Sequence, residues 1–170
     1  MSSFVRIPSI DTGNAIERIG KEWMLITVKD EKKGRVNAMT ASWGAMGVLW
    51  RKDICICFVR PQRHTYSLLG GKEELSVAFL PEKYRDALKL CGTASGRDTD
   101  KLAEAGLHTI TLDGVDVIEE AEVVLVLKKL YEDDIREESF IDKAFLADYI
   151  NGDYHRFYIC QIMSAYKKGE

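Results

Sequence analysis

The chain has 170 residues, of which 46% are hydrophobic and 30% charged, and its formal net charge is −3. These values suit one globular domain with a real core, so we expect a single domain over residues 1–170. The absence of a net positive charge disfavours bulk nucleic-acid binding. No apolar run approaches the roughly 20 residues that span a bilayer, and residues 1–18 lack a signal-peptide core. We therefore expect a cytoplasmic protein that binds neither nucleic acid nor membrane.

Five runs of apolar and β-branched residues predict strands, at residues 23–29, 54–60, 75–80, 121–131 and 155–166. Helices are expected at residues 62–69, 81–90, 98–105 and 140–149, with Asp98 as an N-cap and Gly106 as a stop. Many strands without regular strand–helix alternation predict a mainly β protein, a small antiparallel β-barrel with short helical excursions. No G-x-G-x-x-G follows a strand, which disfavours a Rossmann nucleotide site.

Four cysteines are present, and none shows the C-x-x-C spacing of a zinc site. Buried apolar side chains in a reducing compartment explain them most simply. The alternative is a thiol or metal sensor, which requires the cysteines to converge in space. Their scatter along the chain argues against that alternative, and three scattered histidines suggest no metal site. The cysteines are Cys55, Cys57, Cys91 and Cys160.

The segment 37–44, NAMTASWG, combines small side chains, hydroxyl groups and a tryptophan. A flat heteroaromatic ring needs close approach of backbone, donors for its carbonyls and nitrogens, and an apolar wall on one face. This segment offers all three features. Read alone, it also fits a small-residue loop that packs under a barrel.

The segment 59–66, VRPQRHTY, places Arg60 and Arg63 where a buried strand meets a helix start. Free N–H groups and the helix dipole favour a phosphate there, and arginine adds bidentate bonds. Thr65 adds a hydroxyl donor. The alternative is a solvated strand end whose arginines pair with surface carboxylates. Together with the segment 37–44, however, this one favours a ligand with both a ring and a phosphate, a phosphorylated flavin.

Two further loops are candidates for the same ligand. In the segment 91–98, CGTASGRD, amide donors and the charge of Arg97 suit one edge of a flavin, unless Asp98 is only a helix cap. In the segment 151–156, NGDYHR, an Asn-Gly turn precedes His155, which either reaches a ligand or follows a simple turn.

Taken in order, the runs NAMTASWGAMGVLW, VRPQRHTY, LCGTASGRDTDK and NGDYHRFYI resemble the flavin reductase-like family, which has an FMN-binding split-barrel fold. The resemblance covers roughly residues 15–166. It implies a homodimer of six-stranded Greek-key barrels, with one FMN at each end of the dimer interface. Many relatives carry Gly-Asp-His near the nicotinamide, whereas here Tyr154 separates Asp153 from His155. The resemblance implies that His155 is the catalytic residue on the nicotinamide side, whereas the inserted Tyr154 argues against efficient use of NADH or NADPH.

By position, the resemblance also assigns the residues that bind the cofactor. The isoalloxazine ring is expected along Met39, Thr40, Ala41 and Ser42, with Trp43 close by. The phosphate is expected at Arg60, Arg63 and Thr65. A loop that closes on the flavin, from the same or the other subunit, is expected to contain Ser95, Gly96 and Arg97.

Two functions follow from this resemblance. In the first, NADH or NADPH passes a hydride directly to flavin N5, and reduced FMN serves a monooxygenase or another acceptor. In the second, the protein is a non-enzymatic electron carrier, similar to flavoredoxin, that exchanges electrons with a protein acceptor. The loop 152–156 separates the two functions, because it either receives a nicotinamide or merely caps the barrel.

Overall fold

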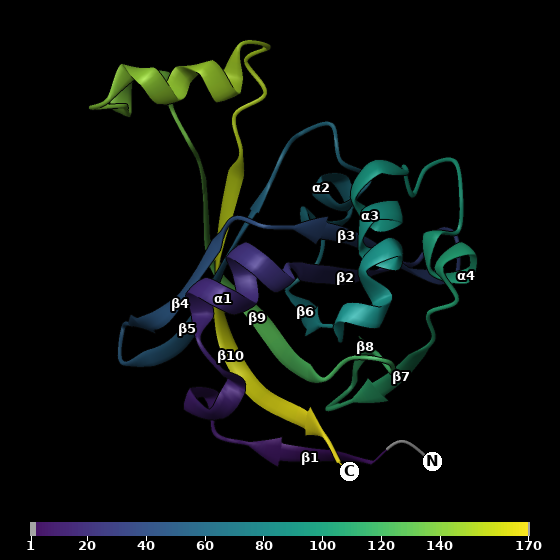
Figure 1. The fold of residues 1–170 in the computed structure, drawn as a ribbon. Coiled ribbons are helices and arrows are strands. Elements are labelled where there is room, and N and C mark those ends of the chain that lie inside the picture. The colour runs from purple at the N-terminus through teal and green to yellow at the C-terminus, as the bar shows by residue number, and fades with distance from the viewer. Residues whose placement is uncertain (1–2, 170) are drawn as a thin grey trace.

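The computed structural model describes residues 3–169, which form a strongly curved antiparallel sheet with helices packed against it (Figure 1). The strand order of the main sheet is β3-β2-β6-β9-β10-β5-β4, and β1 pairs with β10. These strands are β1 (Phe4–Ile7), β2 (Met24–Asp30), β3 (Arg35–Ala41), β4 (Gly44–Leu49), β5 (Lys52–Val59), β6 (Glu74–Phe79), β9 (Val123–Asp134) and β10 (Arg156–Lys168). A separate two-stranded ribbon comprises β7 (Thr109–Leu112) and β8 (Val115–Ile118).

Short helices and helical turns connect the strands. They are η1 (Ser9–Thr12), α1 (Ala15–Glu17), η2 (Arg18–Glu22), α2 (His64–Leu69), η3 (Glu82–Tyr84), α3 (Arg85–Thr93), α4 (Lys101–Ala105), η4 (Glu137–Ser139) and η5 (Lys143–Tyr149). The predicted helix at 98–105 begins later than expected. The N–H of Asp98 donates to the carbonyl of Ser95, which closes a turn, and the side chain of Asp100, not Asp98, accepts from the N–H of Ala103.

All five predicted strands are present within a few residues, as β2, β5, β6, β9 and β10. The strands β3 and β4 were not predicted: residues 37–44 were interpreted as a ring-binding segment or a small-residue loop, and no element was predicted for residues 45–49. Pairing decides their structure instead, since β3 is in register with β2 from Asp30↔Arg35 to Met24↔Ala41. The predicted ring-binding residues therefore lie at the end of a strand, which fixes their backbone.

Alternating side chains fill two apolar layers, one on each face of the sheet. Ile26 of β2 and Leu125 of β9 belong to the layer inside the curve of the sheet. Their neighbours Leu25 and Val124 belong to the second layer, beneath α3, α4 and the β7–β8 ribbon. Burial on both faces explains the continuously apolar runs in the sequence and makes this sheet a rigid frame for the residues at its ends.

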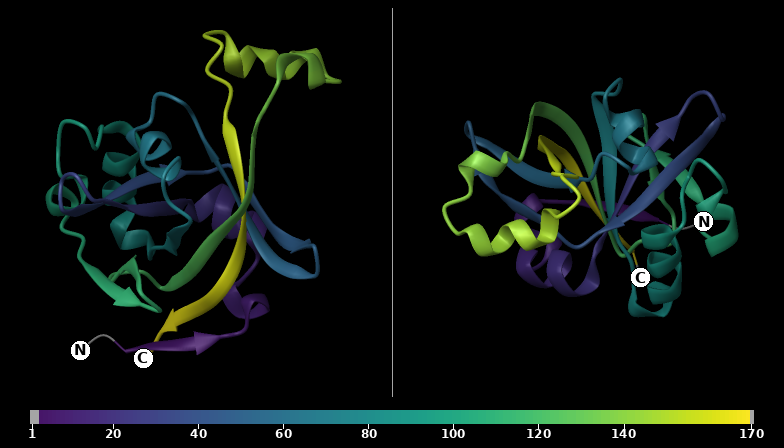
Figure 2. Two further views of the ribbon diagram at one scale, coloured as in Figure 1. Left: turned by 180° about the vertical axis from the view of Figure 1, so that it is seen from behind. Right: turned by 90° about the horizontal axis from the view of Figure 1, so that it is seen from above.

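The chain between β9 and β10 forms a projection that we call the arm, residues 132–155. It comprises the end of β9, the helical turns η4 and η5, and the return to β10. In Figure 1, and from behind in the left view of Figure 2, the arm projects away from α1–α4. Two irregularities in the β9–β10 pairing, at Ile159/Cys160 and Ile162/Ser164, accompany the curvature of this long hairpin.

Candidate functional site

A cavity of about 220 Å³, which we call the inner cavity, lies where β3 and β5 end. Its wall contains eight residues near the two predicted segments and one residue of the arm. They are Met39, Thr40, Ala41, Ser42, Trp43, Phe58, Arg60, Arg63 and His155. The sequence positions them by ending β5 at Val59, just before Pro61, so that two arginines leave the sheet together.

Arg63 is fixed at the end of α3. Its guanidinium donates to the carbonyls of Gly92 (2.7 Å) and Cys91 (2.9 Å), which lie in the last turn of that helix. The negative end of a helix dipole attracts a cation there. Burial lowers the pKa of Arg63 from its ordinary value, but an arginine stays charged at neutral pH. The inner cavity therefore has a fixed positive charge.

Arg60 joins the inner cavity to the arm. Its guanidinium lies 2.6 Å from the carboxylate of Asp153 and donates to the carbonyl of Asp148 at 3.0 Å. It also lies over the ring of Tyr149, 5.0 Å from the centroid. A hydrogen bond from Gln62 and another from Arg60 lower the pKa of Asp153. Part of the charge of Arg60 is thus neutralised by the arm.

His155 is 7% exposed and faces the inner cavity. Burial, followed by the charge of Arg60, lowers its pKa to about 4, so the imidazole is neutral at neutral pH. The hydroxyl of Tyr149 lies 2.8 Å from Nδ1, and the ring of Trp43 lies 5.0 Å away between centroids. Despite the inserted Tyr154, which stacks on Tyr149, the imidazole reaches the site.

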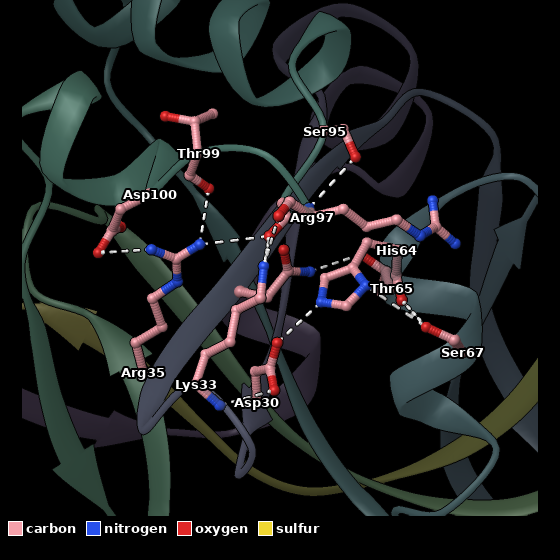
Figure 3. A network of polar contacts seen from close by, with 12 residues as sticks. Asp30, Lys33, Arg35, His64, Thr65, Ser67, Ser95, Arg97, Thr99 and Asp100 are labelled. Carbon is pink, nitrogen blue, oxygen red and sulfur yellow. Dashed lines mark hydrogen bonds and ion pairs between the residues drawn. The ribbon is translucent and has the colours of Figure 1, made fainter.

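Four predicted site residues do not line the inner cavity. Thr65 is buried and accepts a hydrogen bond from the amide of Asn37 (2.8 Å). Ser95, Gly96 and Arg97 lie on a neighbouring loop held down by two cations from the β2–β3 hairpin (Figure 3). Those cations are Lys33, which donates to the carbonyls of Gly96 (2.8 Å) and Arg97 (2.7 Å), and Arg35, which donates to that of Thr99 (2.9 Å).

Lys101 was not among the residues predicted for the site. It is 4% exposed, and its ammonium donates to the carbonyl of Cys91 at 3.3 Å. Burial, followed by the nearby charge of Arg63, lowers its pKa to about 8. Nothing in the sequence around Lys101 indicates this burial. A second cation therefore stands behind the inner cavity.

The cysteines are less scattered in space than their sequence positions suggested. Cys55, Cys57 and Cys160 lie in one apolar layer, and Cys160 is opposite Cys55 in the β5–β10 ladder. All are buried free thiols, and contact with Cys55 followed by burial raises the pKa of Cys57 well above its ordinary value. Over residues 3–169, no group of three or more His, Cys, Asp or Glu side chains is arranged to hold a metal ion.

The sequence model of one protein family, the flavin reductase like domain, matches residues 16–166. The chain belongs to this family. Similar solved structures include the FMN-binding protein from Thermus thermophilus with bound p-hydroxybenzaldehyde, at a TM-score of 0.66 and 22% identity over 85% of this chain and 70% of that one. Flavoredoxin from Methanosarcina acetivorans has a TM-score of 0.66 and 18% identity, over 86% of this chain and 68% of that one.

A third structure of the same fold is the styrene monooxygenase flavin reductase from Pseudomonas putida S12. It has a TM-score of 0.65 and 13% identity over 88% of this chain and 79% of that one. These likenesses confirm the predicted split-barrel fold of this flavin reductase-like chain. No curated protein was found to match it. Among the described residues, no helix is both long and apolar enough to cross a membrane.

Proposed function

We propose that this flavin reductase-like protein binds FMN with the inner cavity and acts as an oxidoreductase. The convergence of Arg60 and Arg63 with the small residues 39–42 on one wall carries the proposal. With His155 neutral, that wall has two positive charges and no carboxylate, which favours an anionic ligand. Structures of the same fold include one described as an FMN-binding protein and two described as flavoredoxins, which supports the choice of FMN.

The surroundings of the inner cavity also suit a larger ligand. Small-molecule sites usually measure roughly 300–1,000 Å³, so the inner cavity, at about 220 Å³, accommodates only part of a cofactor. An adjoining cavity of about 520 Å³ shares Ser42, Trp43 and Phe58 and is otherwise lined mainly by α1, η2 and β4. The two together provide apolar walls for a ring beside the arginines.

FMN, when bound, supplies the redox chemistry by taking up a hydride or electrons and passing them on. The residues of the inner cavity bind the flavin and orient it, because direct hydride transfer requires neither a nucleophile nor a general acid. Arg60 and Arg63 provide the positive potential, and Trp43 provides an apolar ring. His155 acts as a neutral hydrogen-bonding group whose Nδ1 is tied to Tyr149.

The reaction proposed first is reduction of FMN by NADH or NADPH, with a monooxygenase or another acceptor using the reduced flavin. The imidazole of His155, which faces the inner cavity, favours this enzyme, because that residue is expected on the nicotinamide side. A second candidate is an electron carrier with a protein acceptor. The arm beside the cavity contains eight carboxylates and two basic residues, and this charge favours the carrier because charged rims steer protein partners.

Titration of the flavin-free protein with FMN and riboflavin tests the cofactor proposal. We expect Arg60→Ala to weaken FMN binding by about tenfold or more and riboflavin binding by much less, since only FMN has a phosphate. Arg6→Ala, exposed on β1 and outside the cavity wall, is the matched control. Equal losses for both flavins, or no FMN binding by the wild type, would overturn the proposal.

Anaerobic addition of NADH and, separately, NADPH distinguishes enzyme from carrier. Rapid bleaching of the flavin absorbance by either donor supports the reductase and identifies the donor. Stable yellow colour with both, followed by bleaching with dithionite, supports the carrier. The same preparation should release FMN rather than FAD on denaturation.

We further propose a homodimer in the cytoplasm. Apolar side chains are exposed beside the β4–β5 hairpin, where Trp50 packs edge-on against Tyr131 and Val48 is 74% exposed. Covering such a patch is the usual role of a subunit interface. Light scattering after size exclusion should give twice the mass of 19.3 kDa, and Val48→Glu should reduce it to the monomer value. Buried free thiols agree with a reducing compartment.

A further inference from the structure

A second, larger cavity of about 820 Å³ lies between the arm and the ends of β9 and β10. We call it the outer cavity. Trp43 lines both cavities, so the two spaces adjoin at this residue. The wall of the outer cavity includes the aromatic rings of Phe140, Phe145, Tyr149 and Phe157. Such rings favour stacking with a flat aromatic ligand.

The charge of the outer cavity is opposite to that of the inner cavity. Its wall contains four carboxylates, Asp133, Asp134, Asp142 and Asp148, and one base, Arg136. Asp133 is paired with Arg136, and Asp134 with Arg156. The carboxylates of Asp142 and Asp148 have no cation within ion-pair distance among the described residues, and Asp142 accepts only from the N–H of Ala144.

The whole arm shares this negative charge. Residues 132–155 contain eight carboxylates and two basic residues, Arg136 and Lys143, and therefore carry a net charge of −6 with His155 neutral. Because the full chain has a formal charge of −3, the remaining residues carry +3. The field around the outer cavity consequently opposes anions, although the inner cavity beside it attracts them.

We propose that the outer cavity binds a neutral or cationic aromatic molecule and keeps anionic groups, such as the phosphates of a dinucleotide, outside. That this molecule is the reaction partner of the flavin rests on the proposed function, whereas its binding does not require FMN. The aromatic walls select a flat apolar ligand, and the unpaired carboxylates independently select its charge.

A series of naphthalene probes of similar size tests the proposal on flavin-free protein by calorimetry. The probes are 2-naphthylmethylamine, which is a cation, 2-naphthylmethanol, which is neutral, and 2-naphthoate, which is an anion. At low salt we expect the cation to bind at least as tightly as the alcohol and about tenfold more tightly than the anion. High salt should narrow the differences, because it screens partly exposed charges.

Two sets of variants connect the result to the outer cavity. Asp142→Asn with Asp148→Asn should bring the three affinities within about threefold of one another, while Asp11→Asn with Asp86→Asn, remote carboxylates on η1 and α3, should leave the series unchanged. Phe145→Ser, which removes an exposed ring from the wall, should weaken all three probes together. Asn at 142 keeps the helix cap, so loss of folding is not expected.

The outcomes separate this inference from the proposed function. Equal affinities in the wild type, or tightest binding of 2-naphthoate, would overturn it. Absence of saturable binding by every probe would overturn it too, because the space would then be filled, for example by a second copy of the chain. If the expected series is found but FMN does not bind, the selectivity of the outer cavity stands and the proposed function fails. If FMN binds but the three probes bind with equal affinity, the proposed function stands and the selectivity of the outer cavity is overturned.

Discussion

Arg60 and Asp153 form an ion pair, 2.6 Å between Nη1 and Oδ2, that connects the inner cavity to the arm. The same guanidinium is the one we expect to attract the phosphate of the cofactor. We therefore expect ligand and arm to compete for one positive charge, so that occupancy of the inner cavity affects how tightly Arg60 holds the arm.

Asp153→Asn should strengthen FMN binding severalfold, because it removes the carboxylate that neutralises Arg60 while keeping a polar side chain near Gln62. The gain should shrink at high salt, since both partners are partly exposed. Fluorescence titration with FMN measures the effect. Asp98→Asn, on the neighbouring loop outside the cavity wall, is the control. Weaker binding in Asp153→Asn would show that the carboxylate itself positions the ligand.

His155 should make stability depend on pH in a defined window. Its folded pKa of about 4 lies below the ordinary value of 6.5, so the unfolded chain binds the proton more readily. The stability due to neutral His155 is complete above pH 6.5 and is lost as the pH falls toward 4, by about 3 kcal/mol at most. Urea unfolding of wild type and His155→Gln at several pH values measures this contribution. Parallel curves for the two proteins would contradict the assignment.

Lys101 should lower the free energy of unfolding of the protein but strengthen the binding of FMN. Its pKa of about 8 lies below the ordinary 10.5, so the buried ammonium is disfavoured and stability due to this group rises between pH 8 and 10.5. Lys101→Met should therefore stabilise the protein at neutral pH by about 1–3 kcal/mol. It should also weaken FMN binding, because a charge beside Arg63 is lost. Loss of stability would mean that the bond to Cys91 outweighs desolvation.

The sequence predicted the buried strands of the sheet better than it predicted the contacts within the candidate site. The apolar runs predict the buried strands because burial on both faces has a compositional signature, as in β5. Pairs of hydrogen-bonding residues have no such signature, because nothing in the sequence links Arg60 to Asp153 or Lys101 to Cys91. The strand β3 was missed for the same reason, since pairing with β2 outweighs the weak strand preference of its small residues. Motif spacing predicted the groups of the inner cavity, but not their partners.

Gly96 should be intolerant of a side chain, for a reason visible only in three dimensions. A Cβ there would overlap the amide oxygen of Asn37 and crowd the ring of His64. Gly96→Ala should destabilise the protein by about 1–3 kcal/mol and loosen the loop that Lys33 and Arg35 hold (Figure 3). Gly71→Ala, with no atom within 4 Å of the added carbon, should be nearly neutral. Thermal unfolding compares them, and equal effects would contradict the packing argument.

The fluorescence of Trp43 should change when a ring binds in a cavity that its indole lines. Its indole lines the inner and outer cavities and the adjoining cavity beside α1, so a ring bound in any of them contacts it. FMN added to flavin-free protein should quench tryptophan emission, and Trp43→Phe should remove most of that quenching while retaining an aromatic wall. Trp50→Phe, at the β4–β5 turn, should keep it, because Trp50 lines none of these cavities. Quenching that disappears with Trp50 and persists without Trp43 would place the flavin elsewhere.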